Sequence, residues 1–221
     1  MKVAAIIPAA GSGNRFGSEK QFKLFKGKPL LNYSVEKFIN TPTIKEIVIV
    51  VPAPKVKKIK NNFQHVSLNK KIKVIGGGNT RQGSVKNALN VLEEDIDLVC
   101  IHDAARPLVT EELINKTIKK SIRYDGAIAA VQPVDTVKTF FENKIKGTLD
   151  RQKILLAQTP QVFKKNKLIV AFERALKKNI ISTDESSLME EAGFLIVPVV
   201  GDVLNFKITS PCFNLAFSAG L

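Results

Sequence analysis

The sequence predicts an α/β fold built on an open, mostly parallel sheet. Short runs rich in β-branched residues alternate with longer stretches whose apolar residues recur at helical spacing. Several short runs are apolar throughout, as in parallel strands that are covered on both faces. Alternation of strand and helix is typical of an open α/β sheet. The expected strands are residues 3–7, 46–51, 73–75, 98–101, 127–131 and 196–200.

Helices are expected between these strands. Apolar residues fall on one helical face in the four stretches that contain Leu31, Ile59, Val85 and Ile114. Thr110 is placed to cap the last of these, because Glu111 and Glu112 follow it where a helix favours acidic residues. Ser210-Pro211 predicts the start of one more helix near the end of the chain.

One segment departs from the alternation. Residues 137–141 and 144–149 flank Glu142-Asn143, which predicts a β-hairpin that projects from the sheet as an arm. An isolated hairpin buries little surface, so we expect it to pack on a second copy of the chain. The sequence has no internal repeat or linker. It therefore predicts one domain over residues 1–221, with residues 137–150 as a dimerisation arm.

The composition limits the class of protein. Of 221 residues, 44% are hydrophobic and 24% charged, as in globular proteins, and no apolar run reaches the length of a membrane span. The N-terminus has a short apolar run, but Pro8 interrupts it before a glycine-rich loop, so secretion is disfavoured. Cys100 and Cys212 form no disulfide framework, and Cys100 is expected to be a core residue. A cytoplasmic location is expected.

The net charge of +14 allows nucleic acid, an acidic membrane or phosphorylated small molecules as partners. Lysine far outnumbers arginine and is scattered along helix faces, as on a solvated surface. The arginines at positions 15, 81, 106 and 151 instead fall near turns or element ends, and arginine suits two-pronged phosphate contacts.

Several of the expected strands are followed by loops whose residues are suited to binding a charged ligand. The first is followed by Ala9-Ala10-Gly11 and then Gly13, Arg15 and Lys20, where small residues let backbone N–H groups approach an anion. The dinucleotide fingerprint and the P-loop pattern both fail here, so a structural turn stays an alternative.

The loops after the third and fourth expected strands also carry candidate binding residues. The third strand leads into three glycines that permit a flat ligand to approach. The fourth leads into His102-Asp103, where Asp103 is placed to bind Mg²⁺, with an Asx-turn or a helix cap as the alternative. His102 is expected to be structural rather than a base.

These motifs together give a specific resemblance. In order along the chain they are Pro8-Ala9-Ala10-Gly11 with Arg15, Lys20-Gln21, Gly77-Gly78, Arg81, Ser84-Val85, His102-Asp103-Ala104-Ala105-Arg106-Pro107, Asp135-Thr136, Asp150-Arg151, Thr159-Pro160-Gln161, Thr183-Asp184-Glu185 and Lys207-Ile208-Thr209. Over nearly the whole chain the sequence resembles the 2-C-methyl-D-erythritol 4-phosphate cytidylyltransferase family. The resemblance implies a Rossmann-like three-layer fold of the nucleotide-diphospho-sugar transferase type.

The resemblance also implies an activity and a site. The family joins CTP to methylerythritol phosphate and releases pyrophosphate, in non-mevalonate isoprenoid synthesis, as a homodimer. The implied catalytic residues are Arg15, Lys20 and Lys207, and Asp103 is the implied ligand of Mg²⁺. The implied substrate-binding residues are Ala9, Ala10, Gly11, Gly78, Asn79, Ser84, Ala104, Arg106, Asp135, Thr136, Arg151, Thr159 and Thr183. Arg151 would reach the partner's site from the arm.

The chain departs from the family pattern at three positions. Glu19 replaces a usual proline, Asn79 replaces a usual aspartate, and Pro133 lies one place late. A sister enzyme acting on ribitol 5-phosphate and a relative without activity stay as alternatives. A nucleic-acid-binding protein is the alternative of a different class, although the chain has no Trp and only two Tyr for base stacking. We expect neither nucleic acid nor membrane among the partners.

Overall fold

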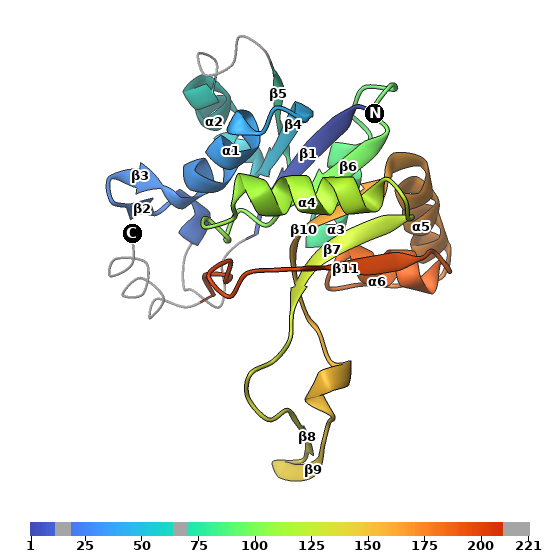
Figure 1. The fold of residues 1–221 in the computed structure, drawn as a ribbon. Coiled ribbons are helices and arrows are strands. Elements are labelled where there is room, and N and C mark those ends of the chain that lie inside the picture. Colours follow the sequence, from blue (N-terminus) through green and yellow to red (C-terminus); the bar gives the residue numbers. More distant parts are fainter. Residues whose placement is uncertain (12–18, 64–69, 210–221) are drawn as a thin grey trace.

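The computed structural model describes residues 1–11, 19–63 and 70–209 of the chain. A seven-stranded sheet forms its centre, with the strand order β11-β7-β10-β6-β1-β4-β5 (Figure 1). Six of its strands are β1 (Val3–Pro8), β4 (Ile44–Val51), β5 (Lys71–Gly76), β6 (Leu98–Ile101), β7 (Gly126–Val131) and β11 (Ile196–Val200). All six were predicted from the sequence, to within two residues at each end.

The prediction missed the seventh strand, β10 (Leu156–Lys164). This strand is antiparallel to both of its neighbours, β6 and β7, and its pairing with β7 is irregular between Ala157 and Gln161. It carries buried polar residues and Pro160 where a buried strand normally has aliphatic side chains. The sheet is therefore mostly parallel with one reversed member.

Helices cover both faces of the sheet and give three layers. On one face lie α1 (Leu30–Asn40), α2 (Val56–Phe63) and α4 (Glu111–Ser121), which pack in the same core cluster as Ala5 and Ile7 of β1. On the other face lie α3 (Arg81–Leu89), α5 (Lys165–Lys177) and α6 (Glu185–Glu191), with Ala4 and Ile6. The alternation of these β1 residues between two cores explains why the whole strand is apolar.

The structure tests the predicted cap of α4 and the predicted burial of Cys100. The Thr110 side chain accepts a hydrogen bond from the Leu113 amide, which confirms the predicted cap of α4. Cys100 is fully buried, and burial raises the pKa of its thiol, as expected of a core residue. The helix predicted from Ser210-Pro211 lies outside the described residues. Short elements complete the chain: η2 (Lys20–Phe22), β2 (Leu24–Phe25), β3 (Lys28–Pro29), η3 (Ala53–Lys55) and η4 (Arg151–Lys153).

The predicted hairpin is present as β8 (Lys138–Phe141) and β9 (Lys144–Thr148), and Figure 1 shows it projecting away from the body. Glu142 and Asn143 at its tip both have positive φ, as a tight hairpin turn requires. Large apolar side chains stay exposed on it, among them Phe140 at 77% and Ile145 at 70%. Across the part of the chain that the structure describes, no helix has both the length and the apolar character to cross a bilayer.

The packing of α5 gives a matched stability test. Leu168 is fully buried and Leu176 is 62% exposed on the same helix. We expect Leu168→Ala to lower the free energy of unfolding by about 2–5 kcal/mol, because it leaves a cavity in the core. Leu176→Ala should change it by less than about 0.5 kcal/mol. Urea unfolding followed by circular dichroism measures both; equal effects would contradict the assigned packing.

Candidate active site

The candidate site lies at the rim of the sheet where parallel strands end. Ala9 follows β1, Gly77 follows β5, and His102 and Asp103 follow β6. These three strands run parallel within the sheet, so their carboxyl ends meet at one edge. Ligands of open α/β sheets bind at this edge.

The first loop is fixed at its start by a glutamine. Gln21 is 5% exposed, and its side-chain amide donates to the carbonyl oxygens of Ala9 at 2.8 Å and Gly11 at 2.9 Å. The Ala9 amide donates to the Val50 carbonyl, so the backbone is held from both sides. Gln21 thus ties η2, which follows the first loop, to residues 9–11 at the start of that loop. Lys20 is partly buried beside it, whereas Arg15 lies outside the described residues.

The glycine run after β5 packs directly on the first loop. A Cβ atom on Gly77 would lie 2.2 Å from the Ala10 Cβ, so only glycine fits there. The Gly78 amide donates to the Ser84 hydroxyl at 3.1 Å, and that hydroxyl donates to the Thr80 carbonyl. Ser84 therefore shapes the backbone of the run. The structure brings three of the predicted site residues, Ala10, Gly78 and Ser84, into neighbouring segments, while Asn79 is exposed.

Asp103 forms the charged centre of the site. Its carboxylate accepts from the Lys207 ammonium at 2.7 Å and from the Arg81 guanidinium at 3.1 Å. Burial acts to raise the pKa of Asp103, but Arg81 and Lys207 hold that pKa well below its usual value. Asp103 is therefore ionised, and its ion pair with Lys207 brings together two of the residues to which the sequence assigned a role.

Arg81 continues the cluster to a second carboxylate. It donates to Glu185, at the start of α6, at 2.6 Å. Burial raises the pKa of Glu185, and the attraction of Arg81 opposes this rise. Among the described residues, Arg81 Nη2, Glu185 Oε2 and Arg106 Nε are buried without a hydrogen-bond partner. Such orphaned polar atoms are rare in proteins and are consistent with a polar ligand at this place.

His102 supports Asp103 from behind. The Asp103 amide donates to the Thr159 hydroxyl, and that hydroxyl lies 3.0 Å from His102 Nδ1. The other ring nitrogen, Nε2, lies 3.0 Å from the Arg106 carbonyl, which can only accept, so in the neutral ring Nε2 carries the proton and Nδ1 accepts from Thr159. Burial lowers the pKa of His102 to about 4, so the ring is neutral. His102 is structural, as expected, and Thr159 is buried with its hydroxyl engaged in this network.

The segment that carries Lys207 is anchored by an asparagine. Asn205 is 1% exposed and donates to the Thr159 carbonyl at 2.8 Å and to the Gln158 side chain at 3.2 Å. Arg106 donates to the Asn205 carbonyl at 2.7 Å, and the Ile208 amide donates to Ala105. These bonds tie the Lys207 segment to the Asp103 loop, of which Ala104 is a buried member.

The remaining predicted residues lie elsewhere in the single chain. Asp135, Thr136 and Arg151 are exposed at the root of the arm, where the Arg151 guanidinium donates to the Val134 carbonyl. Thr183 is exposed just before α6. Within the described part of the chain, no hydrogen bond or ion pair joins the arm residues to Asp103 or Lys207.

Comparison with known proteins identifies the family. A family model for 2-C-methyl-D-erythritol 4-phosphate cytidylyltransferase matches residues 3–218. The chain belongs to this family. The cytidylyltransferase of Caldanaerobacter subterraneus is 40% identical over 96% of this chain and 95% of that protein, and the Solibacter usitatus protein of the same name is 39% identical over 96% and 92%. The crystal structure of the Francisella tularensis cytidylyltransferase matches all of both chains with a TM-score of 0.85 and 34% identity.

Family membership confirms the resemblance read from the sequence and the Rossmann-like α/β fold. The sequence motifs assigned no role to Gln21, Glu185 and Asn205, which the structure places in the candidate site. Gln21 and Glu185 stood inside motifs, but the motifs do not reveal that Gln21 bonds back to Gly11 across the first loop or that Glu185 pairs with Arg81, 104 residues away. For Asn205, a polar residue two places before Lys207 was the one available signal.

One departure from the family pattern is resolved by a contact. Glu19, which stands where the cytidylyltransferase family usually has proline, forms an ion pair with Lys55 at 2.8 Å. Its negative charge is therefore matched by a nearby cation, and Lys55 also lies over the ring of Phe22 in the neighbouring η2.

The neutral state of His102 predicts a pH dependence of stability. Its pKa is about 4 in the folded chain and near 6.5 when exposed, so between these values the unfolded chain binds more protons. The free energy of unfolding should therefore fall as the pH is lowered from about 6.5 to 4, by about 3 kcal/mol from this group. We expect His102→Gln, which cannot titrate, to lose this part of the dependence. Urea unfolding at pH 7 and pH 4 measures it; the same slope in both proteins would contradict the assignment.

Proposed function

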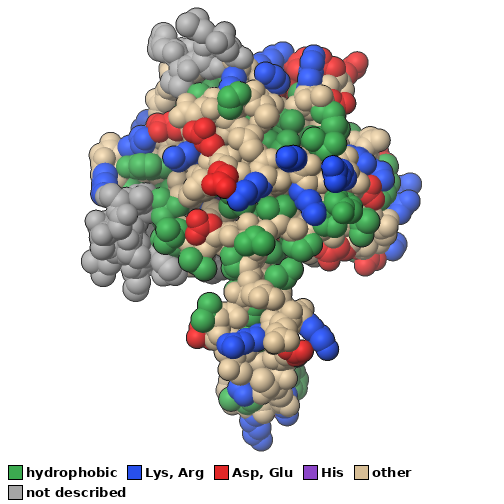
Figure 2. Space-filling view, viewed as in Figure 1, with side chains coloured by type: hydrophobic (Ala, Val, Ile, Leu, Met, Phe, Trp, Pro, Cys, Tyr) green, Lys and Arg blue, Asp and Glu red, His purple; other side chains and the backbone are tan. Residues whose placement is uncertain are grey.

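We propose that this chain transfers the cytidylyl group of CTP to 2-C-methyl-D-erythritol 4-phosphate and releases pyrophosphate. Membership of the cytidylyltransferase family carries the proposal, and the cluster of Asp103, Lys207 and Arg81 at the end of β6 supports it. The names of the relatives favour methylerythritol phosphate over ribitol phosphate as the acceptor. On the face in Figure 2, lysine and arginine side chains lie scattered among other residues, which favours small anionic substrates over a nucleic acid.

CTP is proposed to bind along the carboxyl rim. Ala10 and Gly11 offer backbone N–H groups to the triphosphate, with Arg15 and Lys20 as its cations, while the bonds of Ala9 to Val50 and Gln21 fix the start of this loop. Gly78, Asn79 and Ser84 lie where the base is expected, and the packing of Gly77 on Ala10 brings the two segments into contact. A base and its phosphates could thus be held by adjacent loops.

The chemistry is substitution at the α-phosphorus. An oxygen of the sugar phosphate forms the new bond to that phosphorus, and the bond to the β-phosphate breaks, so that pyrophosphate leaves with the electron pair. The attacking oxygen is already ionised near neutral pH, so the reaction needs no general base. The chief obstacle is repulsion between two anions, which fixed cations reduce. Lys207 has three N–H donors and uses one on Asp103, so it can also donate to the α-phosphate.

Mg²⁺ is the proposed cofactor, and the chemistry of the donor set fits it. The Asp103 carboxylate has about four lone-pair positions, and the contacts with Arg81 and Lys207 occupy two of them. Within the described ranges no group of three His, Cys, Asp or Glu side chains could hold a metal ion alone. This suits Mg²⁺, which commonly binds one or two carboxylates together with substrate phosphates. When bound, the ion would neutralise phosphate charge.

The acceptor site is proposed to be shared between two chains. Asp135, Thr136 and Arg151 lie at the root of the arm, and Thr183 precedes α6. The arm exposes Phe140, Phe141 and Ile145, an apolar surface that a partner subunit would cover. In such a homodimer Arg151 of each chain would serve the sugar phosphate of the other. Figure 2 shows hydrophobic side chains on the arm and at its root. A cytoplasmic location stays a prediction.

A pyrophosphate-release assay with CTP and Mg²⁺ tests the function. We expect turnover with methylerythritol phosphate and far less with ribitol 5-phosphate. Lys207→Ala and Lys20→Ala should each lower kcat by about two to three orders of magnitude, because both remove charge where it develops in the transition state.

Lys57→Ala, on the exposed face of α2, removes the same charge from the surface and should leave kcat unchanged. Comparable activity of Lys207→Ala and Lys57→Ala would refute the assigned roles, and release with neither acceptor would refute the function.

Subunit mixing tests the shared site. Homodimers of Lys207→Ala and of Arg151→Ala should both be nearly inactive. If Arg151 acts across the interface, a mixed dimer contains one site with both residues intact, so mixing should restore about a quarter of wild-type activity. Sedimentation measures the oligomeric state in parallel. A monomer, or no recovery after exchange of subunits, would contradict the proposed arm.

A further inference from the structure

Arg81 lies between two carboxylates from different parts of the chain. Its Nε donates to Asp103 at 3.1 Å and its Nη1 donates to Glu185 at 2.6 Å. Asp103 has a proposed role as metal ligand, but Glu185 is 1% exposed and faces no proposed substrate. A carboxylate is costly to bury unless its charge is matched, so the position of Glu185 calls for a reason beyond packing.

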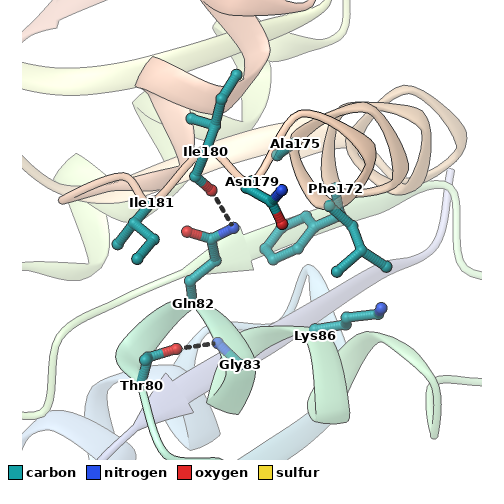
Figure 3. Close-up of a pocket in the computed structure, with 10 residues that line it drawn as sticks. Thr80, Gln82, Gly83, Lys86, Phe172, Ala175, Asn179, Ile180 and Ile181 are labelled. Carbon is teal, nitrogen blue, oxygen red and sulfur yellow. Dashed lines mark hydrogen bonds between the residues drawn. The ribbon is translucent and has the colours of Figure 1, made fainter.

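Glu185 is held firmly against Arg81. It begins α6, whose cap is Asp184, and Asp184 accepts hydrogen bonds from the Ser187 amide and from the buried Gln161 side chain. Gln82, the neighbour of Arg81, donates to the Ile180 carbonyl at 3.2 Å and accepts from the Ser182 amide at 3.0 Å. Figure 3 shows Gln82 reaching from α3 to the segment before α6, beside a pocket of about 280 Å³. Together with the Arg81–Glu185 ion pair, these bonds join the first turn of α3 to the start of α6.

The charges of the cluster explain what Glu185 can do. Arg81, Lys207 and Arg106 are the cations that act on Asp103. Arg81 forms ion pairs with Asp103 at 3.1 Å and with Glu185 at 2.6 Å, so both carboxylates enter the balance as anions. The three cations and two carboxylates then sum to one net positive charge, whereas without Glu185 the sum would be two. A second net positive charge would repel a divalent cation more strongly and attract a bare phosphate more strongly.

We propose that Glu185 is a positioning residue for the transferase reaction: it holds Arg81 between two carboxylates and so keeps Asp103 able to bind a divalent cation. This inference rests on the proposed metal role of Asp103. Glu185 touches neither substrate in the proposed arrangement and acts through the Arg81 guanidinium alone. The site would thereby select nucleotide with its metal over nucleotide without it.

Calorimetric binding of CTP and Mg²⁺ tests this without relying on turnover. In Glu185→Gln we expect the dissociation constant of Mg²⁺ for the protein–CTP complex to rise about tenfold. The positive charge of Arg81 would then be balanced by Asp103 alone, and the excess positive charge would repel the metal ion. Binding of CTP in EDTA should become tighter or stay the same. If Glu185 had only a structural role, its replacement would weaken the binding of Mg²⁺ and also the binding of CTP in EDTA. Glu190→Gln, which removes an exposed carboxylate from the same helix, is the matched control and should alter neither constant.

A charge-balanced double variant completes the test. Arg81→Gln combined with Glu185→Gln removes one cation and one anion, so the net charge returns to that of the native site. We expect it to recover most of the lost Mg²⁺ affinity. It also serves if Glu185→Gln alone does not fold, which thermal melting reveals, because removing both partners of a buried pair leaves no uncompensated charge.

Two results would overturn the proposal: unchanged Mg²⁺ affinity in Glu185→Gln, or a double variant weaker than the single one. These outcomes are separate from failure of the function itself. If wild-type protein binds CTP and Mg²⁺ but releases no pyrophosphate with methylerythritol phosphate, the proposed reaction fails while the role of Glu185 can still be measured.

Discussion

A buried carboxylate between two cations is the constraint on which the rest of the site depends. Asp103 can stay ionised at the end of β6 because Arg81 and Lys207 both face it. Each of these cations comes from a separate segment, α3 and the stretch after β11. Satisfying one charge therefore fixes the relative positions of three parts of the chain, and that arrangement brings the first loop, the glycine run and Lys207 to one rim.

The hydrogen bonds behind Asp103 serve the same constraint. A neutral His102 ring links Thr159 to the Arg106 carbonyl, and Asn205 links the Lys207 segment to β10. None of these groups carries a charge, so they position the cations without adding to the electrostatic balance. The bonds of this network fix the backbone around Asp103, although two of its atoms, Asn205 Oδ1 and Arg106 Nε, are buried without a hydrogen-bond partner.

The sequence predicted most of the sheet because burial on two faces leaves a simple pattern. The six predicted strands are short runs rich in β-branched and other apolar residues, and this pattern can be recognised without knowledge of any distant contact. β10 escaped because Gln158, Thr159 and Gln161 are polar and buried, and their partners lie tens of residues away. The same reason explains the site: Asp103 and Lys207 stood in recognisable motifs, whereas the pairing of Glu185 with Arg81 spans about a hundred residues.

The reversed direction of β10 has a topological consequence. β7 ends at the rim that holds Asp103, the arm follows, and β10 starts at that rim because it runs antiparallel to β7. A parallel strand in this place would have to begin at the opposite edge and would need a crossover. One inverted strand thus lets a long excursion leave and re-enter the domain beside the catalytic groups. The arm can therefore change in length or shape during evolution without altering the strand order of the core. Any new surface on the arm would lie next to the candidate active site.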